Sequence, residues 1–312
     1  MGVPARHVLA QGPMLMTLLR TAASVAAKRA LKDYAPKEER AEGPIRARLP
    51  PRPAGLVRDY IRHVGGDSSW YRGVVPGHLF PQWGMPLLAR TLTGLPYDLT
   101  RVLNGGVTFE FLAPIPADEP LEVEARLVSI DDDGRRAILR QECVTGTRSS
   151  PRALVATTSA IVPLAKSTEK KERPRVVPSE GGDLRELGRW RLRTSAGVDF
   201  AKLTGDFNPI HLFAPYARAA GQKSVILHGY ATLARAIETL NRALFAQDPR
   251  RLTRIEVRFV RPLVLPNEVG VYCDGNRLFV GDAPFGPAYL TGTFDSSSTT
   301  NGKAREAHRG ES

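Results

Sequence analysis

The 312-residue sequence has only two cysteines, six histidines and no long hydrophobic run. Cys143 and Cys273 lie in strand-like runs without the spacing of a metal site, so we expect buried free thiols in a reducing cytoplasm. No segment approaches the roughly 18 apolar residues of a membrane-spanning helix. Zinc-finger spacing, an aromatic RNA-binding signature and a basic helical region are also missing. We therefore expect a cytoplasmic protein with no membrane span and no nucleic-acid partner.

Positive charge is in excess, with 44 Lys and Arg against 32 Asp and Glu, a formal net charge of +12. Such a balance suits nucleic acid, an anionic membrane, an acidic carrier protein or a ligand with several phosphates, and it does not choose among them. The first 32 residues contain five basic residues and no acidic one. A helix that docks on the body of the protein, or a weak membrane-surface contact, is favoured there over an organelle-targeting helix.

Composition divides the chain into five segments. Residues 1–56 are expected to form an N-terminal helix and a Pro-rich, charged linker. Residues 57–164 form a first domain, residues 165–186 a second linker, and residues 187–295 a second domain. Residues 296–312, rich in Ser, Thr and Gly, are expected to be a disordered tail.

The two domains carry a repeated pattern. Gly84 aligns with Gly229, each is followed by a helix containing Leu-Ala-Arg, and an aromatic-X-X-Pro motif recurs at Phe111 and Phe259. A single supersecondary unit is therefore used twice.

Each unit contains one apolar helix followed by several strands. In the second unit Leu233, Ile237, Leu240 and Leu244 lie on one helical face. The runs that follow are rich in β-branched and aromatic residues and are broken by turn signals. This order predicts the α+β class, and specifically a double hot-dog: two antiparallel sheets, each wrapped round a central helix.

The stretch "TGDFNPIHLFAPYARAAGQKSVILHG", Thr204–Gly229, concentrates polar residues at a corner. Gly205 is a good helix C-terminal residue. Pro209 forces Asn208 out of the helical region, so an extended turn over Asp206–His211 is predicted. An amide such as Asn208 commonly ties such a turn to the backbone.

These residues supply the parts of an acid–base site. Asp206 and His211 can face one space and bind one water between them, as adding or removing water across a carbon–carbon double bond requires. Gly229 follows His228 and opens the apolar helix, where free N–H groups can hold a carbonyl oxygen and a glycine permits close approach. A metal site from Asp206, His211 and His228 matches no common ligand spacing, and no metal or other cofactor is expected.

The motifs "GDFNPIH" and "AGQKSVILHGYATL" resemble those of the MaoC-like, (R)-specific enoyl-CoA hydratase family of the hydratase 2 type. The resemblance implies catalysis by Asp206 and His211 and ordering of the loop by Asn208. It also implies that the Gly229 N–H polarises a thioester carbonyl, with His228 beside it as a substrate-binding residue.

The first domain departs from this motif. Asp67 stands where the second domain has Asp206, but no histidine follows in register, and Trp83 aligns with His228. We therefore expect the first hot-dog to be degenerate and the second to be catalytic. In two-repeat relatives this half is associated with room for a long acyl chain.

The resulting hypothesis is a hydro-lyase of fatty acid metabolism that interconverts trans-2-enoyl and (R)-3-hydroxyacyl thioesters. The carrier is coenzyme A or an acyl carrier protein, both anionic, and a homodimer is left open. The sequence does not assign the separate roles of Asp206 and His211. Two alternatives are a non-catalytic acyl-thioester-binding protein and a hot-dog thioesterase.

Overall fold

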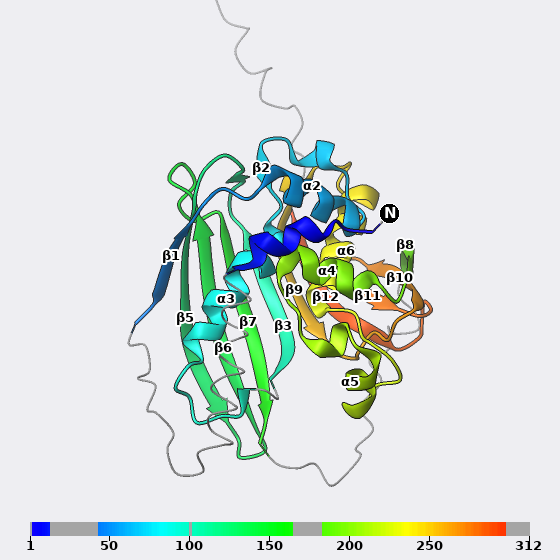
Figure 1. Cartoon of the computed structure of the whole chain (residues 1–312). Coiled ribbons are helices and arrows are strands. Elements are labelled where there is room, and N and C mark those ends of the chain that lie inside the picture. Colours follow the sequence, from blue (N-terminus) through cyan, green and yellow to red (C-terminus); the bar gives the residue numbers. More distant parts are fainter. Residues whose placement is uncertain (1, 13–42, 100–101, 165–182, 298–312) are drawn as a thin grey trace, which may run out of the picture.

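The computed structural model describes residues 2–12, 43–99, 102–164 and 183–297 (Figure 1). The apolar stretch Met14–Ala27, most of the linker 165–186 and most of the tail 296–312 lie outside the described residues. The described part is α+β, as predicted, with helices packed against one large antiparallel sheet.

The helices and strands have the following bounds. The α-helices are α2 (Ala54–His63), α3 (Pro81–Thr91), α4 (Ala196–Thr204), α5 (Ala214–Ala219) and α6 (Gly229–Ala243). Short 3-10 helices are η1 (Ala5–Gln11), η2 (Ser68–Tyr71), η3 (Gly77–Leu79), η5 (Pro209–His211) and η6 (Pro249–Arg251). The strands of the first half are β1 (Ile45–Leu49), β2 (Val74–Val75), β3 (Leu103–Phe111), β4 (Ile115–Pro116), β5 (Leu121–Asp132), β6 (Arg136–Gly146) and β7 (Leu154–Pro163). Those of the second half are β8 (Arg185–Leu192), β9 (Leu252–Phe259), β10 (Asn267–Asp274), β11 (Arg277–Gly281) and β12 (Ala288–Ser296).

The large sheet has ten strands in the order β1-β5-β6-β7-β3-β9-β12-β11-β10-β8. Five strands come from each half of the chain, and the second set repeats the order of the first in reverse. The two predicted sheets are therefore joined edge to edge, because β3 pairs with β9 in antiparallel register from Gly106–Arg258 to Glu110–Arg254. This pairing satisfies the backbone of two strands that would otherwise be exposed sheet edges.

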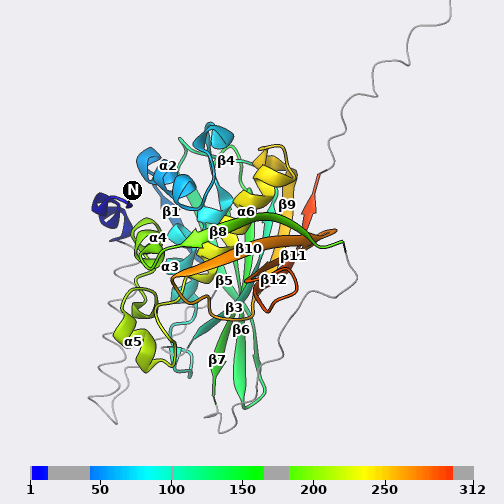
Figure 2. The ribbon, with the colours of Figure 1, turned by 90° about the vertical axis from the view of Figure 1, so that its right-hand side faces the viewer.

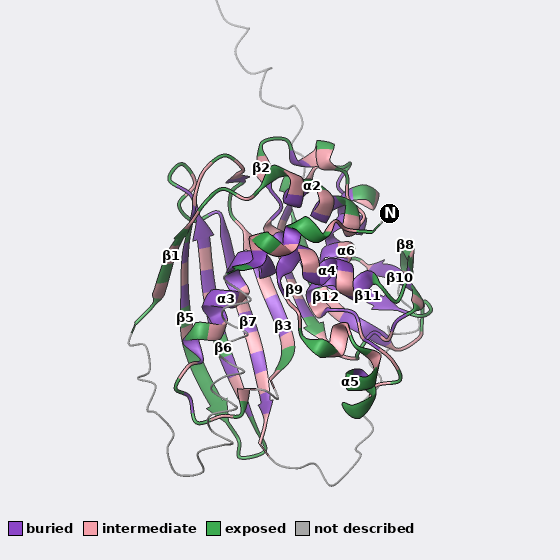
Figure 3. Cartoon of the chain, in the orientation of Figure 1, coloured by how far each residue is buried: buried purple, intermediate pink, exposed green. Residues whose placement is uncertain are grey.

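A central helix covers each half of the sheet (Figures 1 and 2). Helix α3 contacts β5 and β6, and helix α6 contacts β8, β9 and β12. The strands alternate buried with less buried residues, as in β6 and β7, so that one face of the sheet meets the helices. Figure 3 shows the buried residues concentrated on α6 and on the strand faces that the helices cover.

The two halves correspond in the structure in a different register from the one that the sequence motifs predicted. In the first half Val74 pairs with Pro116, five residues after Phe111. In the second half Ile226 pairs with Val264, five residues after Phe259. Counting three residues on from Val74 and from Ile226 places Gly77, not Gly84, opposite Gly229.

The side-chain packing agrees with this register. A Cβ added at Gly77 would lie 2.7 Å from the Phe111 ring, and one added at Gly229 would lie 2.9 Å from the Phe259 ring. Pro76 therefore takes the place of His228 in the first half. The sequence alignment was wrong because Gly84 and Gly229 share only a local motif, Gly followed by an apolar helix, which says nothing about the tertiary position.

The first half also begins earlier than residue 57. Strand β1 lies inside the segment expected to be a linker and pairs with β5 from Ile45–Ala125 to Leu49–Leu121. Its alternation of apolar and arginine residues places Ile45, Ala47 and Leu49 on the more buried face. The sequence predicted a linker here because the residues around this short edge strand are rich in proline and charge.

Candidate active site

The loop between α4 and α5 carries the predicted acid–base pair. Helix α4 ends at Gly205, which adopts φ +83°, a left-handed conformation that favours glycine. Asn208 is extended, and Pro209–His211 closes into one turn of 3-10 helix where a wholly extended turn was predicted. Proline is well suited to open that turn because it has no N–H to satisfy.

Asp206 and Asn208 stabilise this loop through backbone contacts. The Asn208 N–H donates to Asp206 Oδ1 at 3.3 Å, and the Ile210 N–H donates to Asn208 Oδ1 at 3.3 Å. The Asp206 side chain is 34% exposed, so its carboxyl group remains accessible to a ligand or water. Asn208 therefore contacts the loop backbone, the arrangement expected of a residue that orders the turn.

The ring of His211 is oriented by a backbone carbonyl. Its Nδ1 lies 2.9 Å from the carbonyl oxygen of Ile226. A carbonyl can only accept, so Nδ1 carries the hydrogen, and in the neutral imidazole Nε2 keeps a free lone pair. His211 is only partly buried, so Nε2 can accept a proton from a water in the site. Sequence reasoning missed Ile226, because its contribution comes from the main chain and leaves no side-chain signal.

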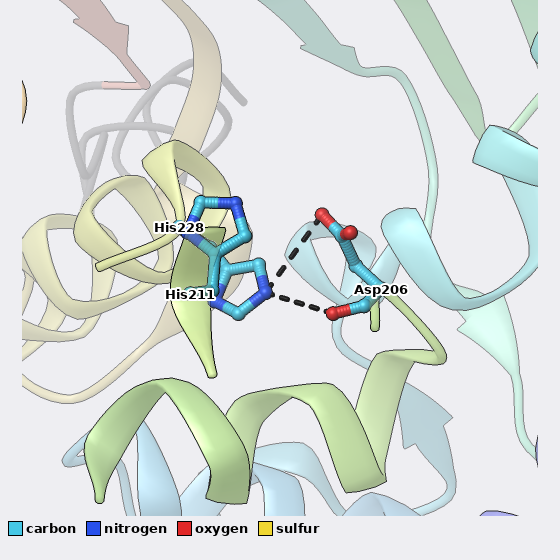
Figure 4. Close-up of side chains that lie close together, drawn as sticks. All are labelled: Asp206, His211 and His228. Carbon is cyan, nitrogen blue, oxygen red and sulfur yellow. Dashed lines mark hydrogen bonds and ion pairs between the residues drawn. The ribbon is translucent and has the colours of Figure 1, made fainter. Parts of the chain in front are cut away.

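His228 packs against His211 and is 2% exposed. The two rings stack with centroids 3.7 Å apart and planes inclined by 28° (Figure 4). His228 Nε2 donates to the backbone oxygen of Asp206 at 2.9 Å and lies 3.8 Å from Asp206 Oδ2. This contact ties the start of α6 to the acidic loop.

Burial and, to a smaller extent, the neighbouring His211 lower the pKa of His228 from 6.5 to about 3. Asp206 opposes this shift, but its effect is smaller. His228 is therefore neutral at ordinary pH, with Nδ1 buried and without a partner in the described part of the chain. The geometry makes it a support for His211 and Asp206.

The three side chains gather closely. Asp206, His211 and His228 each offer one nitrogen or oxygen atom, and these atoms lie within 4.8 Å of one another. Two acceptors up to about 5.5 Å apart can share a single water, since each hydrogen bond is about 2.8 Å long. The same three residues are those that could hold a metal ion. However, each ring already donates one N–H to a carbonyl, and the remaining nitrogen of His228 is buried.

Gly229 is the first residue of α6 and is half-buried. No acceptor in the described part of the chain bonds its N–H, as is usual at a helix start. An added Cβ would lie 2.9 Å from Cδ1 and Cε1 of Phe259. A larger residue at position 229 would therefore clash with Phe259. The sequence had suggested a different reason for this glycine, the close approach of a ligand.

Asp67, the first-half counterpart of Asp206, is exposed and has the same local contact. Its Oδ1 accepts the Ser69 N–H at 2.8 Å, as Asp206 Oδ1 accepts the Asn208 N–H. Among the described residues no histidine hydrogen-bonds or ion-pairs with Asp67. The acid–base constellation is therefore present in the second half alone within the described residues.

Comparison with known proteins also singles out the second half of the chain. The family model "MaoC like domain" matches residues 184–277, the part of the chain that contains the site. A solved "MaoC-like dehydratase" superposes with a TM-score of 0.67 at 20% identity and covers 84% of this chain and 100% of that chain. A Mycobacterium tuberculosis protein described as a double hotdog fold superposes with a TM-score of 0.51 at 15% identity, covering 81% and 93% of the two chains. The molecule is a double hot-dog protein.

Two curated relatives extend this result. A "probable enoyl-CoA hydratase 2" of Dictyostelium discoideum is 24% identical over 221 residues, 69% of this chain and 74% of the relative. A "peroxisomal multifunctional enzyme type 2" of Drosophila melanogaster is 28% identical over 216 residues, 66% of this chain. The match spans only 35% of that longer relative. The second half of the chain thus contains a MaoC-like domain, at residues 184–277.

Proposed function

We propose that the chain is an (R)-specific enoyl-thioester hydratase, or in reverse a 3-hydroxyacyl-thioester dehydratase, of fatty acid metabolism. The observation that carries the proposal is the closeness of the partly exposed carboxyl group of Asp206 to His211, in a cluster whose ligand atoms lie within 4.8 Å of one another. The Nδ1 of His211 is bonded to Ile226, which leaves its Nε2 to accept from a water. The names of the relatives, enoyl-CoA hydratase 2 and multifunctional enzyme type 2, support the same class of reaction.

The proposed chemistry adds one water across the C2–C3 double bond. A water held between Asp206 and His211 donates its hydrogens to these two acceptors, and its oxygen forms the bond to C3. One of the two residues takes a proton from that water, and a proton is delivered to C2. In this proposal the two residues and the water lie on one face of the substrate, so the oxygen and the proton are added from the same side.

Gly229 is proposed to hold the thioester carbonyl. Its N–H has no acceptor in the described part of the chain and lies at the start of α6, where the helix dipole favours negative charge. Charge that develops on the carbonyl oxygen as C3 is attacked would be stabilised there. His228, immediately before Gly229, holds the carbonyl-binding helix start and the Asp206 loop together.

The carrier is proposed to be coenzyme A or an acyl carrier protein. None of the helices in the described part of the chain is long and apolar enough to span a membrane. A cytoplasmic location and a homodimer stay proposals. Cell fractionation of the native chain tests the first, and light scattering on the purified protein tests the second.

The test follows the absorbance of the conjugated enoyl thioester with crotonyl-CoA and with trans-2-octenoyl-CoA. We expect loss of absorbance without release of free thiol, and a product oxidised by an (R)-specific but not an (S)-specific 3-hydroxyacyl-CoA dehydrogenase. Free-thiol release would identify a thioesterase instead. No change with either substrate or with an acyl-carrier-protein thioester would favour a binding protein.

Variants test the residues. Asp206→Asn and His211→Gln should each lower kcat by about 100-fold to 10,000-fold. The double variant should be little worse than either single one, because groups that act on one water are not additive. Asp67→Asn is the matched control, since Asp67 has the same loop contact without a histidine. An equal loss of turnover in the Asp67 variant would show that the wrong half has been assigned.

A further inference from the structure

A cavity lies mainly in the first half of the chain, apart from the residues proposed for catalysis. Its volume is about 320 Å³, within the range of small-molecule sites. It is lined mainly by apolar residues of β2, β4 and the turn Phe111–Pro114, and it is completed by Ile237 of α6 and Leu252 of β9. Both halves of the chain therefore contribute to it, and none of the residues proposed for catalysis lines it.

The cavity occupies the repeat position of the proposed carbonyl site. Gly77 lines the cavity and packs against Phe111 as Gly229 packs against Phe259. Gly77 is half-buried, and no acceptor in the described part of the chain bonds its N–H. The first half thus keeps the backbone donor of the second half and places a cavity beside it.

The polar wall of this cavity lacks a free acid–base pair. His78 Nε2 lies 3.0 Å from Glu238 Oε1, and His78 Nδ1 lies 3.1 Å from the Tyr60 hydroxyl. Tyr71 O–H donates to Glu238 Oε1 at 2.8 Å. These side chains are almost fully buried and bonded to one another, so neither ring nitrogen of His78 is left to activate a water.

The mouth of the cavity does not favour a separate anion. Arg250 lines it, but both guanidinium contacts of this exposed side chain go to Asp248, at 2.8 and 3.0 Å. The lining instead suits an apolar chain with a carbonyl oxygen at its head. A cavity of 150 Å³ holds a benzene molecule, so this one has room for a chain of roughly 8 to 12 carbon atoms.

We propose that the first half retains a second acyl-thioester-binding site, at Gly77 and its cavity, which binds the ligand without converting it. The choice of a thioester as the head group rests on the proposed function. The site lies apart from the catalytic one, because Ile237 is eight residues beyond Gly229, about 12 Å along α6. In Figures 1 and 2, β2 and β4 lie at the end of the molecule opposite α5.

Titration calorimetry with octanoyl-CoA tests the proposal, since this saturated thioester cannot be hydrated. Ala113 lines the cavity and is exposed, so Ala113→Phe should fold and narrow the entrance. We expect this variant to bind one equivalent of octanoyl-CoA fewer than the wild-type chain, with unchanged turnover of both crotonyl-CoA and trans-2-octenoyl-CoA. Ala283→Phe, at another exposed alanine, is the control and should bind as the wild type does.

Protection from alkylation gives an independent readout. The two native cysteines are buried, so Ala113→Cys introduces a reactive thiol at the cavity mouth. Octanoyl-CoA should slow its reaction with a maleimide at least tenfold, whereas a cysteine at Ala283 should react at the same rate with and without ligand. Octanoate at the same concentration should protect less, because the proposal requires the thioester head group.

Three results would overturn the proposal. Equal stoichiometry in the wild type and Ala113→Phe, with no protection of Cys at position 113, would show that the cavity binds no acyl thioester. Loss of octenoyl-CoA turnover in Ala113→Phe with crotonyl-CoA turnover intact would make the cavity part of the catalytic substrate's own binding site. Protection by octanoate alone would assign the cavity to free fatty acids. The binding readouts stand even if the chain hydrates no substrate.

Discussion

At the scale of single residues, two backbone carbonyls set the chemistry of the histidine pair. Ile226 fixes the hydrogen of His211 on Nδ1, and Asp206 fixes that of His228 on Nε2. The stacked rings then differ in environment, since His211 is partly exposed and His228 is buried. The same residue type thus supplies a free ring nitrogen in one case and a buried, neutral ring in the other.

The buried histidine predicts a specific loss of stability in acid. The folded-state pKa of His228 is about 3, below its ordinary value of 6.5. Between these values the unfolded chain binds a proton that the folded chain does not. The contribution of the neutral His228 ring to the free energy of unfolding is therefore fully present above pH 6.5. Below that pH it is lost by up to about 1.4 kcal/mol per pH unit.

Urea unfolding of the wild type and His228→Gln at several pH values from 7.5 to 5 measures this contribution. The variant should show a shallower fall in the free energy of unfolding below pH 6.5, because glutamine does not titrate. Parallel curves for the two proteins would contradict the assignment of the neutral state to burial of this ring.

Substitution of Gly229 should lower both the stability of the protein and its rate of catalysis. Gly229→Ala places a Cβ 2.9 Å from the Phe259 ring, so the free energy of unfolding should fall by about 1–3 kcal/mol despite the better helix propensity of alanine. Movement of the ring at the helix start should also lower kcat if the N–H holds the carbonyl. Thermal unfolding and steady-state kinetics measure the two effects.

Gly77→Ala is the control for this substitution, because its Cβ would meet Phe111 in the same way. It should lower stability by a similar amount and leave kcat unchanged. If Gly229→Ala is destabilised while its rate stays at the wild-type value, the carbonyl donor must lie elsewhere.

At the scale of elements, the junction of β3 and β9 makes one sheet from two repeats. Gly106 pairs with Arg258, and a Cβ added at Gly106 would lie 2.3 Å from the carbonyl oxygen of Val257. A backbone carbonyl in a sheet cannot move aside as the end of a flexible side chain can. This close approach of the two strands therefore requires a glycine in β3. The junction also places the first half beside β9, the strand that ends at Phe259.

Gly106→Ala should therefore weaken the junction between the halves. We expect the free energy of unfolding to fall by at least about 1–3 kcal/mol, the usual cost of overpacking. Amide hydrogen exchange should rise in β3 and β9 more than in β5 and β6. Gly12→Ala is the control, since nothing lies within 4 Å of its added Cβ. Unchanged exchange across the junction would contradict this account.

At the scale of the whole molecule, the first residues of the chain link the two halves. Gln11 Nε2 donates to the carbonyl oxygens of Lys202 and Leu203 at 3.1 and 3.0 Å, and Gln11 Oε1 accepts from Gln82 Nε2 at 3.3 Å. His7 Nε2 lies 2.8 Å from Asp59 Oδ2. The described residues 2–12 thus dock on α2, α3 and α4. Residues 13–32 of the basic N-terminal segment lie outside the described residues, so its expected docking as a whole stays a prediction.

Gln11→Ala tests this link. Gln11 is 1% exposed, and its removal leaves the carbonyl ends of α4 without a buried donor, so the free energy of unfolding should fall by about 1–3 kcal/mol. Leu9→Ala is the control, because Leu9 is 88% exposed. Differential scanning calorimetry compares the two. Equal melting temperatures for both variants would show that the segment adds nothing to the folded state.

Local patterns in the sequence determined the class of fold and the members of the proposed site. The glycine stop at Gly205, the Pro209 turn and the apolar face of the helix after Gly229 depend on backbone sterics and periodicity, which neighbouring residues alone specify. The motif order also placed Asp206, Asn208, His211, His228 and Gly229 in one region, and the structure brings them together.

Only the tertiary structure decided the register of the repeat and the environment of each ring. Gly77 was found opposite Gly229 because strand pairing and contact with Phe111 fix its position, and these contacts join residues more than 30 apart in the chain. The burial of His228 and its closeness to His211, which lower its pKa, likewise depend on α4, α6 and the acidic loop meeting in space. Sequence patterns report which groups are available, whereas dielectric environment and long-range pairing exist only once the chain has folded.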